Sequence, residues 1–185
     1  MIDDIAFLDD ATRPHAPRLA GVTASQREAG LHLRMIHDHL RDNMQVLRRL
    51  IDAAAAGEVT AAQLAEETAD LAMVANFRRF GNLCGQHCQF VHGHHSLEDA
   101  MVFPALAQVS EPLRRVADRL QQEHRVIHEL LLRLIGALER LVAEPTSEHF
   151  AQARRDYEAM ERVLASHLGY EEDEIGDALG VYGII

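Results

Sequence analysis

Four stretches of helical periodicity in this chain each carry a histidine, and three of them carry a second metal-capable side chain four residues later. This spacing places both side chains on one face of a helix, about one turn apart, so that the two can reach one ion. Because such an element recurs on every stretch, at matching depth on the apolar side, four helices can converge on one point. The sequence therefore predicts a buried two-metal site. Its candidate ligands are His39, His94, Glu98, His124, His128, His167 and Glu171.

Capping signatures and helix-breaking residues divide the chain into these stretches. Ser25 with Glu28 forms a capping-box pattern, and Phe103-Pro104 is typical of the end of a helix. We expect helices from Ser25 until Gly57, from Thr60 to about Met101, from Ser110 until just before Pro145, and from Ser147 to about Gly176. Glycines 81, 85 and 93 allow a break in the second, so residues 60–76 are either a separate leading helix or an extension.

The predicted fold class is all-α, because no alternating β pattern occurs in the sequence. Four long helices with short connections favour an up-down-up-down antiparallel four-helix bundle over residues 25–176, with an extra helical segment as an option. Residues 1–24 lack sustained periodicity and predict an N-terminal arm that packs across the domain or stays mobile. Residues 177–185 form the C-terminal tail in this interpretation.

Charge and hydropathy restrict the partners. A net charge of −11 and a pI near 5.5 argue against nucleic acid, whose phosphates need a basic surface. No apolar run approaches the roughly 18 residues that span a bilayer, and the segment 1–10 has four Asp and no basic residue, unlike a signal peptide. We therefore expect a cytoplasmic protein with no membrane or nucleic-acid partner.

Cys84 and Cys88 form a second feature with two interpretations. In a cytoplasmic protein reduced thiols are the default, so the two are either small buried hydrophobic residues or, together with Tyr157, a redox relay above the metal site.

With these motifs, the chain resembles the hemerythrin-like family, also called the HHE cation-binding domain, over about residues 25–176. That family has one His on the first helix, HxxxE on the second, HxxxH on the third, and His with a carboxylate on the fourth. The resemblance implies a non-haem di-iron centre with a bridging oxo or hydroxo species. It assigns His124, His128 and His167 to one iron, His39 and His94 to the other, and Glu98 and Glu171 to the bridges. Imidazole and carboxylate ligands without cysteine also suit iron, with manganese and zinc as alternatives.

Several neighbouring residues are assigned less directly. Either Glu171 or Glu172 could be the second bridge, and we favour Glu171 because its spacing matches that of Glu98. Asn43 and His87 are candidates to line the open position and act on a bound ligand, and the alternative for His87 is a core histidine with its own hydrogen-bond partner. Asp38, Glu123 and Glu172 are either partners of the ligand imidazoles or solvated acids. We place His37, His92 and His95 off the metal face.

The function implied by the resemblance is a reaction with O2 or peroxide in redox homeostasis. The alternative is a sensor of oxygen, NO or iron that signals through an unidentified protein partner. A small diatomic molecule or peroxide is the expected ligand in both cases. Whether the site turns over, as a di-iron catalase, peroxidase or NO-reducing enzyme, stays open at this point. A ferritin-type carboxylate site is disfavoured, because its Glu-x-x-His motif does not occur in the chain.

Overall fold

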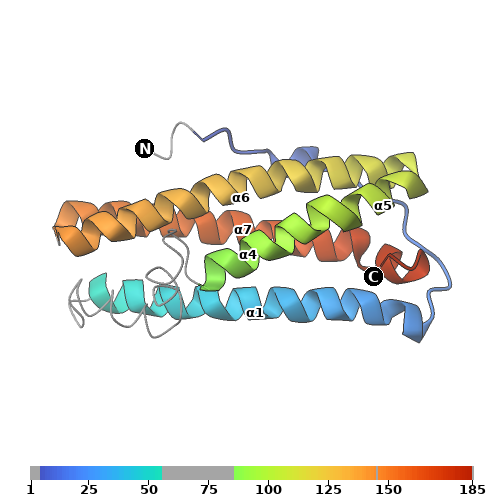
Figure 1. Ribbon diagram of the computed structural model, residues 1–185, viewed down its shortest axis with the longest axis horizontal. Coiled ribbons are helices and arrows are strands. Elements are labelled where there is room, and N and C mark those ends of the chain that lie inside the picture. Colours follow the sequence, from blue (N-terminus) through green and yellow to red (C-terminus); the bar gives the residue numbers. More distant parts are fainter. Residues whose placement is uncertain (1–4, 56–85, 145, 185) are drawn as a thin grey trace.

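Helices account for almost all regular structure in the computed structural model, which describes residues 5–55, 86–144 and 146–184 (Figure 1). The elements are η2 (Asp10–Thr12), α1 (Ala24–Ala55), α4 (Gln86–Leu97), η3 (Glu98–Val102), α5 (Phe103–Val109), α6 (Glu111–Ala143) and α7 (Ser147–Val181). No strand occurs in these described ranges, so the all-α class is confirmed. The segment 60–76 and Cys84 lie outside the described residues, and the side chain of Cys88 does too.

The four long segments lie side by side, and their chain direction reverses from each one to the next along the sequence (Figure 1). The helix α7 contacts both α1 and α6, and the continuous segment α4–η3–α5 contacts α1 and α6. Every long segment therefore has two neighbours, and the inward faces of all four meet. No helix among the described residues is long and apolar enough to cross a membrane.

The capping residues explain where the helices begin. At α1 the capping box is formed by Thr23 and Gln26, two residues earlier than our prediction of Ser25 and Glu28. The Thr23 Oγ1 accepts a hydrogen bond from the Gln26 amide at 3.2 Å, and the Thr23 amide donates to Gln26 Oε1 at 2.9 Å. Ser110 caps α6 as predicted, accepting from the Leu113 amide, and Thr146 caps α7, one residue before the predicted start.

The sequence predicted that the second long segment would end at Phe103-Pro104, but the segment continues past these residues. It passes through the π-helical turn η3 and continues as α5 to Val109. Proline is tolerated because it occupies the first turn of α5, where an amide hydrogen is not required. The fourth helix likewise continues beyond Gly176 to Val181, and it buries Ala178 and Leu179.

The two largest apolar clusters of the described residues lie on either side of a polar layer in the bundle interior. One cluster is built around Leu40, Met160 and Leu164, and the other around Leu33, Phe103 and Leu120. On α1, His37 lies between Leu33 and Leu40 in sequence and is fully buried. Because both sides of the layer exclude water, any polar group inside it must find a partner within the protein or bind a ligand.

Candidate metal centre

Seven buried or nearly buried side chains make up the polar layer. They form two groups, in each of which the ligand-capable atoms lie within 4.8 Å of one another. The first group is His95, His124 and His167, and the second is His37, His94, Glu98 and Glu171. The seven come from all four long segments, as the convergence of four helices predicted.

Carboxylates outside the first group orient its imidazoles. His124 Nδ1 lies 3.0 Å from Asp99 Oδ1, and His167 Nδ1 lies 3.1 Å from Glu123 Oε2. An ionised carboxylate can only accept, so each Nδ1 carries the hydrogen and donates it. In a neutral imidazole this leaves the Nε2 lone pair free to bind a cation, which is the arrangement found around metal-bound histidines.

The second group has an equivalent outer partner. His37 Nδ1 donates to Glu172 Oε1 at 2.9 Å, and Arg41 donates to the same oxygen at 2.6 Å. The Nε2 atoms of His37 and His94 are 3.0 Å apart. Glu172 therefore holds a ligand-type histidine, and Glu171 is the acid placed inside the layer.

Two carboxylates connect the groups. Glu98 Oε1 lies 3.3 Å from His94 Nε2, and Glu98 Oε2 lies 3.7 Å from His124 Nε2. Glu171 Oε2 lies 3.6 Å from His37 Nε2 and 3.4 Å from His167 Nε2. Each carboxylate thus faces one histidine of each group, which is the geometry that a ligand bridging two ions requires.

Many polar atoms in this layer have no hydrogen-bond partner. They are the Nε2 atoms of His95, His124 and His167, Oε2 of Glu98, and both carboxylate oxygens of Glu171. Leaving a buried polar atom unpaired costs about 1–3 kcal/mol, and more when the group is charged. Six such atoms in one layer are therefore costly unless a cation occupies the space between them. The donor set of five imidazoles and two carboxylates fits a pair of borderline metal ions such as iron.

Burial and mutual charge set the protonation of these groups. Burial lowers the pKa of His94 to about 4 and also lowers the pKa of His95 and His124, which favours the neutral, ligating form. Burial alone would lower the pKa of His167, but its hydrogen bond to Glu123 and the negative charge of Glu171 outweigh burial and raise it. A metal ion at His167 would therefore displace a proton on binding.

The two bridging-type carboxylates titrate as a pair. Burial, followed by the charge of Glu171, raises the pKa of Glu98. Burial alone would also raise the pKa of Glu171, but the positive charges of His167 and His37 outweigh it and lower that pKa. Two adjacent buried carboxylates cannot both ionise cheaply without a cation.

The outer contacts reveal an internal twofold relation. His124 on α6 is held by Asp99, which follows Glu98, and His37 on α1 is held by Glu172, which follows Glu171. Each pair of consecutive acids thus supplies one bridging-type and one outer carboxylate. His95 breaks the relation, because the corresponding position in the second half is Leu168.

Two of the predicted ligands lie elsewhere and are corrected by the structure. His39 is exposed and stacks edge-on against Phe90, with ring centroids 5.4 Å apart, while His37 occupies the inward position. His128 is also exposed and lies beside His92, at 5.4 Å between ring centroids, while His95 joins His124 and His167. The expectation that His37 and His95 lie off the metal face is therefore wrong.

Of the two predicted pocket residues, Asn43 does not join either ligand group. Asn43 is half-buried on the side of α1 that carries His39, and its Nδ2 lies 3.3 Å from His39 Nε2. Its position follows from helical geometry, because residues four apart share a face. His87 lies in α4, but its side chain is outside the described residues. Asp38 lies on the surface, in contact with Arg41.

Sequence reasoning missed two histidines, His37 and His95, and the inward position of His95 is compatible with the angular geometry of its helix. Residues 94 and 95 are about 100° apart on a helix, and residue 98 falls between them. A helix can therefore direct both histidines and Glu98 inward if its inner face is centred on Glu98. Val91 and Val102, both buried on α4–η3, share that face. The π turn begins at Glu98 itself, and such turns are frequent at functional sites.

Comparison with known proteins agrees with this geometry. The sequence profile of the hemerythrin HHE cation-binding domain matches residues 31–179, which is most of the chain. The chain belongs to the hemerythrin HHE cation-binding domain family. The match includes every residue of both ligand groups, from His37 to Glu171. No curated protein and no solved structure matches the chain.

Membership of the HHE family implies that the domain binds cations, and the two histidine and glutamate groups could hold them. The resemblance drawn from the sequence is thus confirmed at the level of the family.

Proposed function

We propose that this HHE domain binds two iron ions and reacts with O2 or peroxide in redox homeostasis. The six buried polar atoms without partners carry the proposal, because they face one another in a layer sealed by apolar residues. In the proposed centre one ion is held by His95, His124 and His167, and the other by His37 and His94. Glu98 and Glu171 bridge them.

The difference between the two groups supports small-molecule chemistry. With both carboxylates shared, the first ion has three histidines and the second has two, so the second has fewer protein ligands. An incompletely ligated ion has room for an exogenous ligand. A pair of ferrous ions supplies together the two electrons that reduce O2 to the level of peroxide, or peroxide to water.

The chain's own residues would prepare the centre in two ways. Asp99, Glu123 and Glu172 hold three of the imidazoles by Nδ1, which fixes the tautomer in which Nε2 binds metal. The apolar clusters on either side exclude water, which strengthens every electrostatic interaction inside the layer.

The test is peroxide turnover by the iron-loaded chain. We expect peroxide to be consumed at a rate proportional to the bound iron, with oxygen evolution distinguishing a catalase from a peroxidase. Glu98→Ala should abolish both the turnover and the oxo-to-iron charge-transfer absorption of the oxidised protein. His39→Ala is the control, because His39 is exposed and outside both groups, and it should change neither. An iron-loaded chain that is inert to both O2 and peroxide would contradict the proposal.

A second candidate, a sensor of oxygen, NO or iron, is favoured by one observation. The N-terminal segment hydrogen-bonds to Glu123, which holds His167. A change at the metal centre could therefore reach the surface. Reversible binding of O2 or NO without turnover would favour this candidate.

A further inference from the structure

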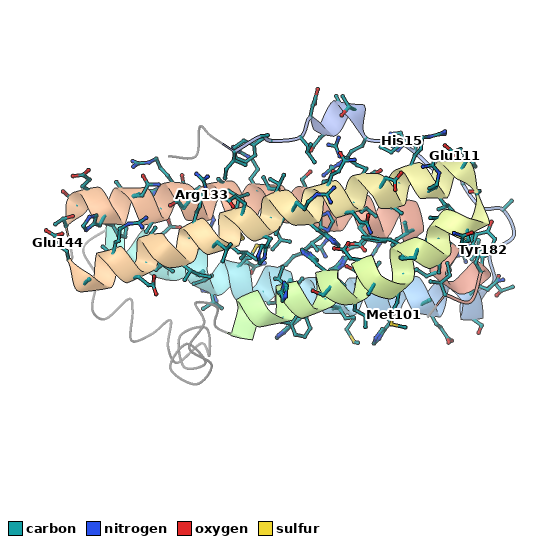
Figure 2. All side chains as sticks on the ribbon, turned by 45° about the horizontal axis from the view of Figure 1, so that its top comes forward. His15, Met101, Glu111, Arg133, Glu144 and Tyr182 are labelled. Carbon is teal, nitrogen blue, oxygen red and sulfur yellow. The ribbon has the colours of Figure 1, made fainter. Side chains whose placement is uncertain are left out.

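The N-terminal segment 5–23, called the arm below, runs along the outside of α6 and α7 before the chain enters α1 (Figure 1). It is fastened at several points. Tyr170 donates to the Pro14 carbonyl at 2.7 Å, and the Ala16 amide donates to Glu174 at 2.8 Å. Figure 2 shows His15 on this segment, at the outer surface, where its Nδ1 lies 2.7 Å from Glu174.

One arm residue reaches toward the interior. Arg13 donates from Nε to Glu123 Oε1 at 2.9 Å and from a second nitrogen to Oε2 at 3.0 Å. This bidentate pairing fixes the plane of the carboxylate. Because Glu123 Oε2 also accepts from His167 Nδ1 at 3.1 Å, only one side chain separates Arg13 from a metal-binding imidazole.

A second arginine fastens the arm to the same carboxylate. Arg119, buried on α6, donates to Glu123 Oε1 at 2.7 Å. It also donates to the Asp9 carbonyl at 2.8 Å and to Thr12 Oγ1 at 3.0 Å, both on the arm. Undocking the arm would therefore remove Arg13 from Glu123 and leave Arg119 without its two other partners.

The other metal group has no such dependence. Glu172, which holds His37, accepts from Arg41, and that arginine is part of α1. The arm thus contributes to the support of the three-histidine group, while the carboxylate that holds His37 is paired, among the described side chains, with arginine of α1.

We propose that the arm is part of the metal centre: Arg13 is a positioning residue that orients His167 through Glu123, so that arm docking and metal binding at the three-histidine group strengthen each other. This inference rests on the proposed function, in that the centre binds metal. Coupling between two sites is reciprocal, so a loss of affinity on undocking equals the gain in docking on metal binding. Loss of an outer partner of a metal-bound histidine typically weakens binding by roughly 10–100-fold, and we expect about 10-fold for Arg13, one contact further out.

The experiment follows hydrogen exchange of the arm in the full-length chain, with and without Fe2+ under anaerobic conditions. The Ala16 amide donates to Glu174 on α7, so its exchange reports undocking directly. The amides of Ala11, Thr12 and Arg13 donate within the arm's own turn and report whether that turn stays ordered. We expect Fe2+ to slow their exchange by about 10-fold. Arg13→Gln should remove this dependence on iron and weaken one of two Fe2+ affinities, measured by chelator competition, by about 10-fold.

Arg41→Gln is the matched control, because it also removes an arginine from a carboxylate that holds a ligand histidine, but on the other group and away from the arm. It should leave the iron dependence of arm exchange intact. Arg13→Lys keeps the charge but cannot contact both Glu123 oxygens, and it serves as the second variant if Arg13→Gln does not fold.

The possible failures are distinguishable. If the chain binds two Fe2+ but arm exchange is the same with and without them, the coupling is refuted and the proposed function stands. Equal loss of iron dependence in Arg13→Gln and Arg41→Gln would show general stabilisation and would also refute the coupling. A chain that binds no Fe2+ at all would overturn both the coupling and the proposed function.

Discussion

Replacing His95 with glutamine discriminates between the centre seen in the structure and the one predicted from helical spacing. His95 is buried, stacks on His124 at 3.8 Å between ring centroids, and directs a partnerless Nε2 into the three-histidine group. His128, which the spacing predicted in its place, is exposed. Glutamine has similar bulk and cannot replace the imidazole as a ligand, so His95→Gln and His128→Gln form a matched pair.

The expected size follows from linkage between binding and folding. At a metal concentration 100 times the Kd, one ion that binds only the folded chain adds about 2.7 kcal/mol to the free energy of unfolding. In a chain of 185 residues each kcal/mol corresponds to roughly 2–4 °C in Tm. Iron should therefore raise the Tm of the wild-type protein by about 5–11 °C for each ion bound at that excess.

The assay is thermal unfolding followed by circular dichroism, with and without Fe2+ under anaerobic conditions. His95→Gln should lose the part of the rise that belongs to the three-histidine group. His128→Gln should keep the whole rise, because exposed substitutions usually change stability by less than about 0.5 kcal/mol. Equal loss in both variants, or loss in His128→Gln alone, would refute the assignment of His95.

Two further predictions concern packing and the surface. Gly180→Ala should destabilise the fold by about 1–3 kcal/mol or more in urea unfolding, because the added Cβ would lie 1.7 Å from the Gln26 carbonyl oxygen. The control is Gly93→Ala, which should be neutral or stabilising because nothing lies within 4 Å of its added Cβ. Equal effects of the two substitutions would contradict the close packing of α1 and α7. The hydrogen bond from Arg48 holds the pKa of Glu161 below its ordinary value of 4.5, so the stability that Glu161 contributes is present above that pH and lost as the pH falls through the lowered pKa. The difference in unfolding free energy between wild type and Glu161→Gln should accordingly close on acidification, and a difference independent of pH would count against this pairing.

The fold could be predicted largely from local signals. Helical periodicity and caps such as Ser110 determine which segments become helices. Both signals involve residues that lie only a few positions apart in the sequence. Pro104 misled the prediction because it falls in the first turn of α5, directly after the π turn, where a proline is tolerated. The burial of Gly176 against Gly30 is also a matter of tertiary contact.

The candidate site could be predicted in composition but not in the rotation of each helix. On α1, Leu31 and Met35 are apolar and four residues apart, and with His39 they suggest an inward stripe. The exposed fractions of Leu31 and Met35 are 61% and 60%, so these residues face the solvent. The stripe that faces inward contains His37. Met101 is a similar case, and Figure 2 shows it at the outer edge of the bundle. Hydrophobicity alone cannot choose between two overlapping faces of one helix.

The same limitation applies to the second long segment. Adjacent histidines at 94 and 95 point about 100° apart, and each has an acid four residues later, so i, i+4 spacing alone cannot decide which of them faces inward. Only the packing of α4 against both α1 and α6 brings His95 to His124. The contact of Asp99 with His124 depends on the same packing, so helical spacing does not predict it either.

The most direct test of the two-metal centre is the iron content of protein purified from iron-supplied cells, combined with its Mössbauer spectrum. Close to two irons per chain, coupled through shared ligands in the oxidised protein, is the predicted result. A single uncoupled iron per chain, or one zinc and no iron, would contradict it.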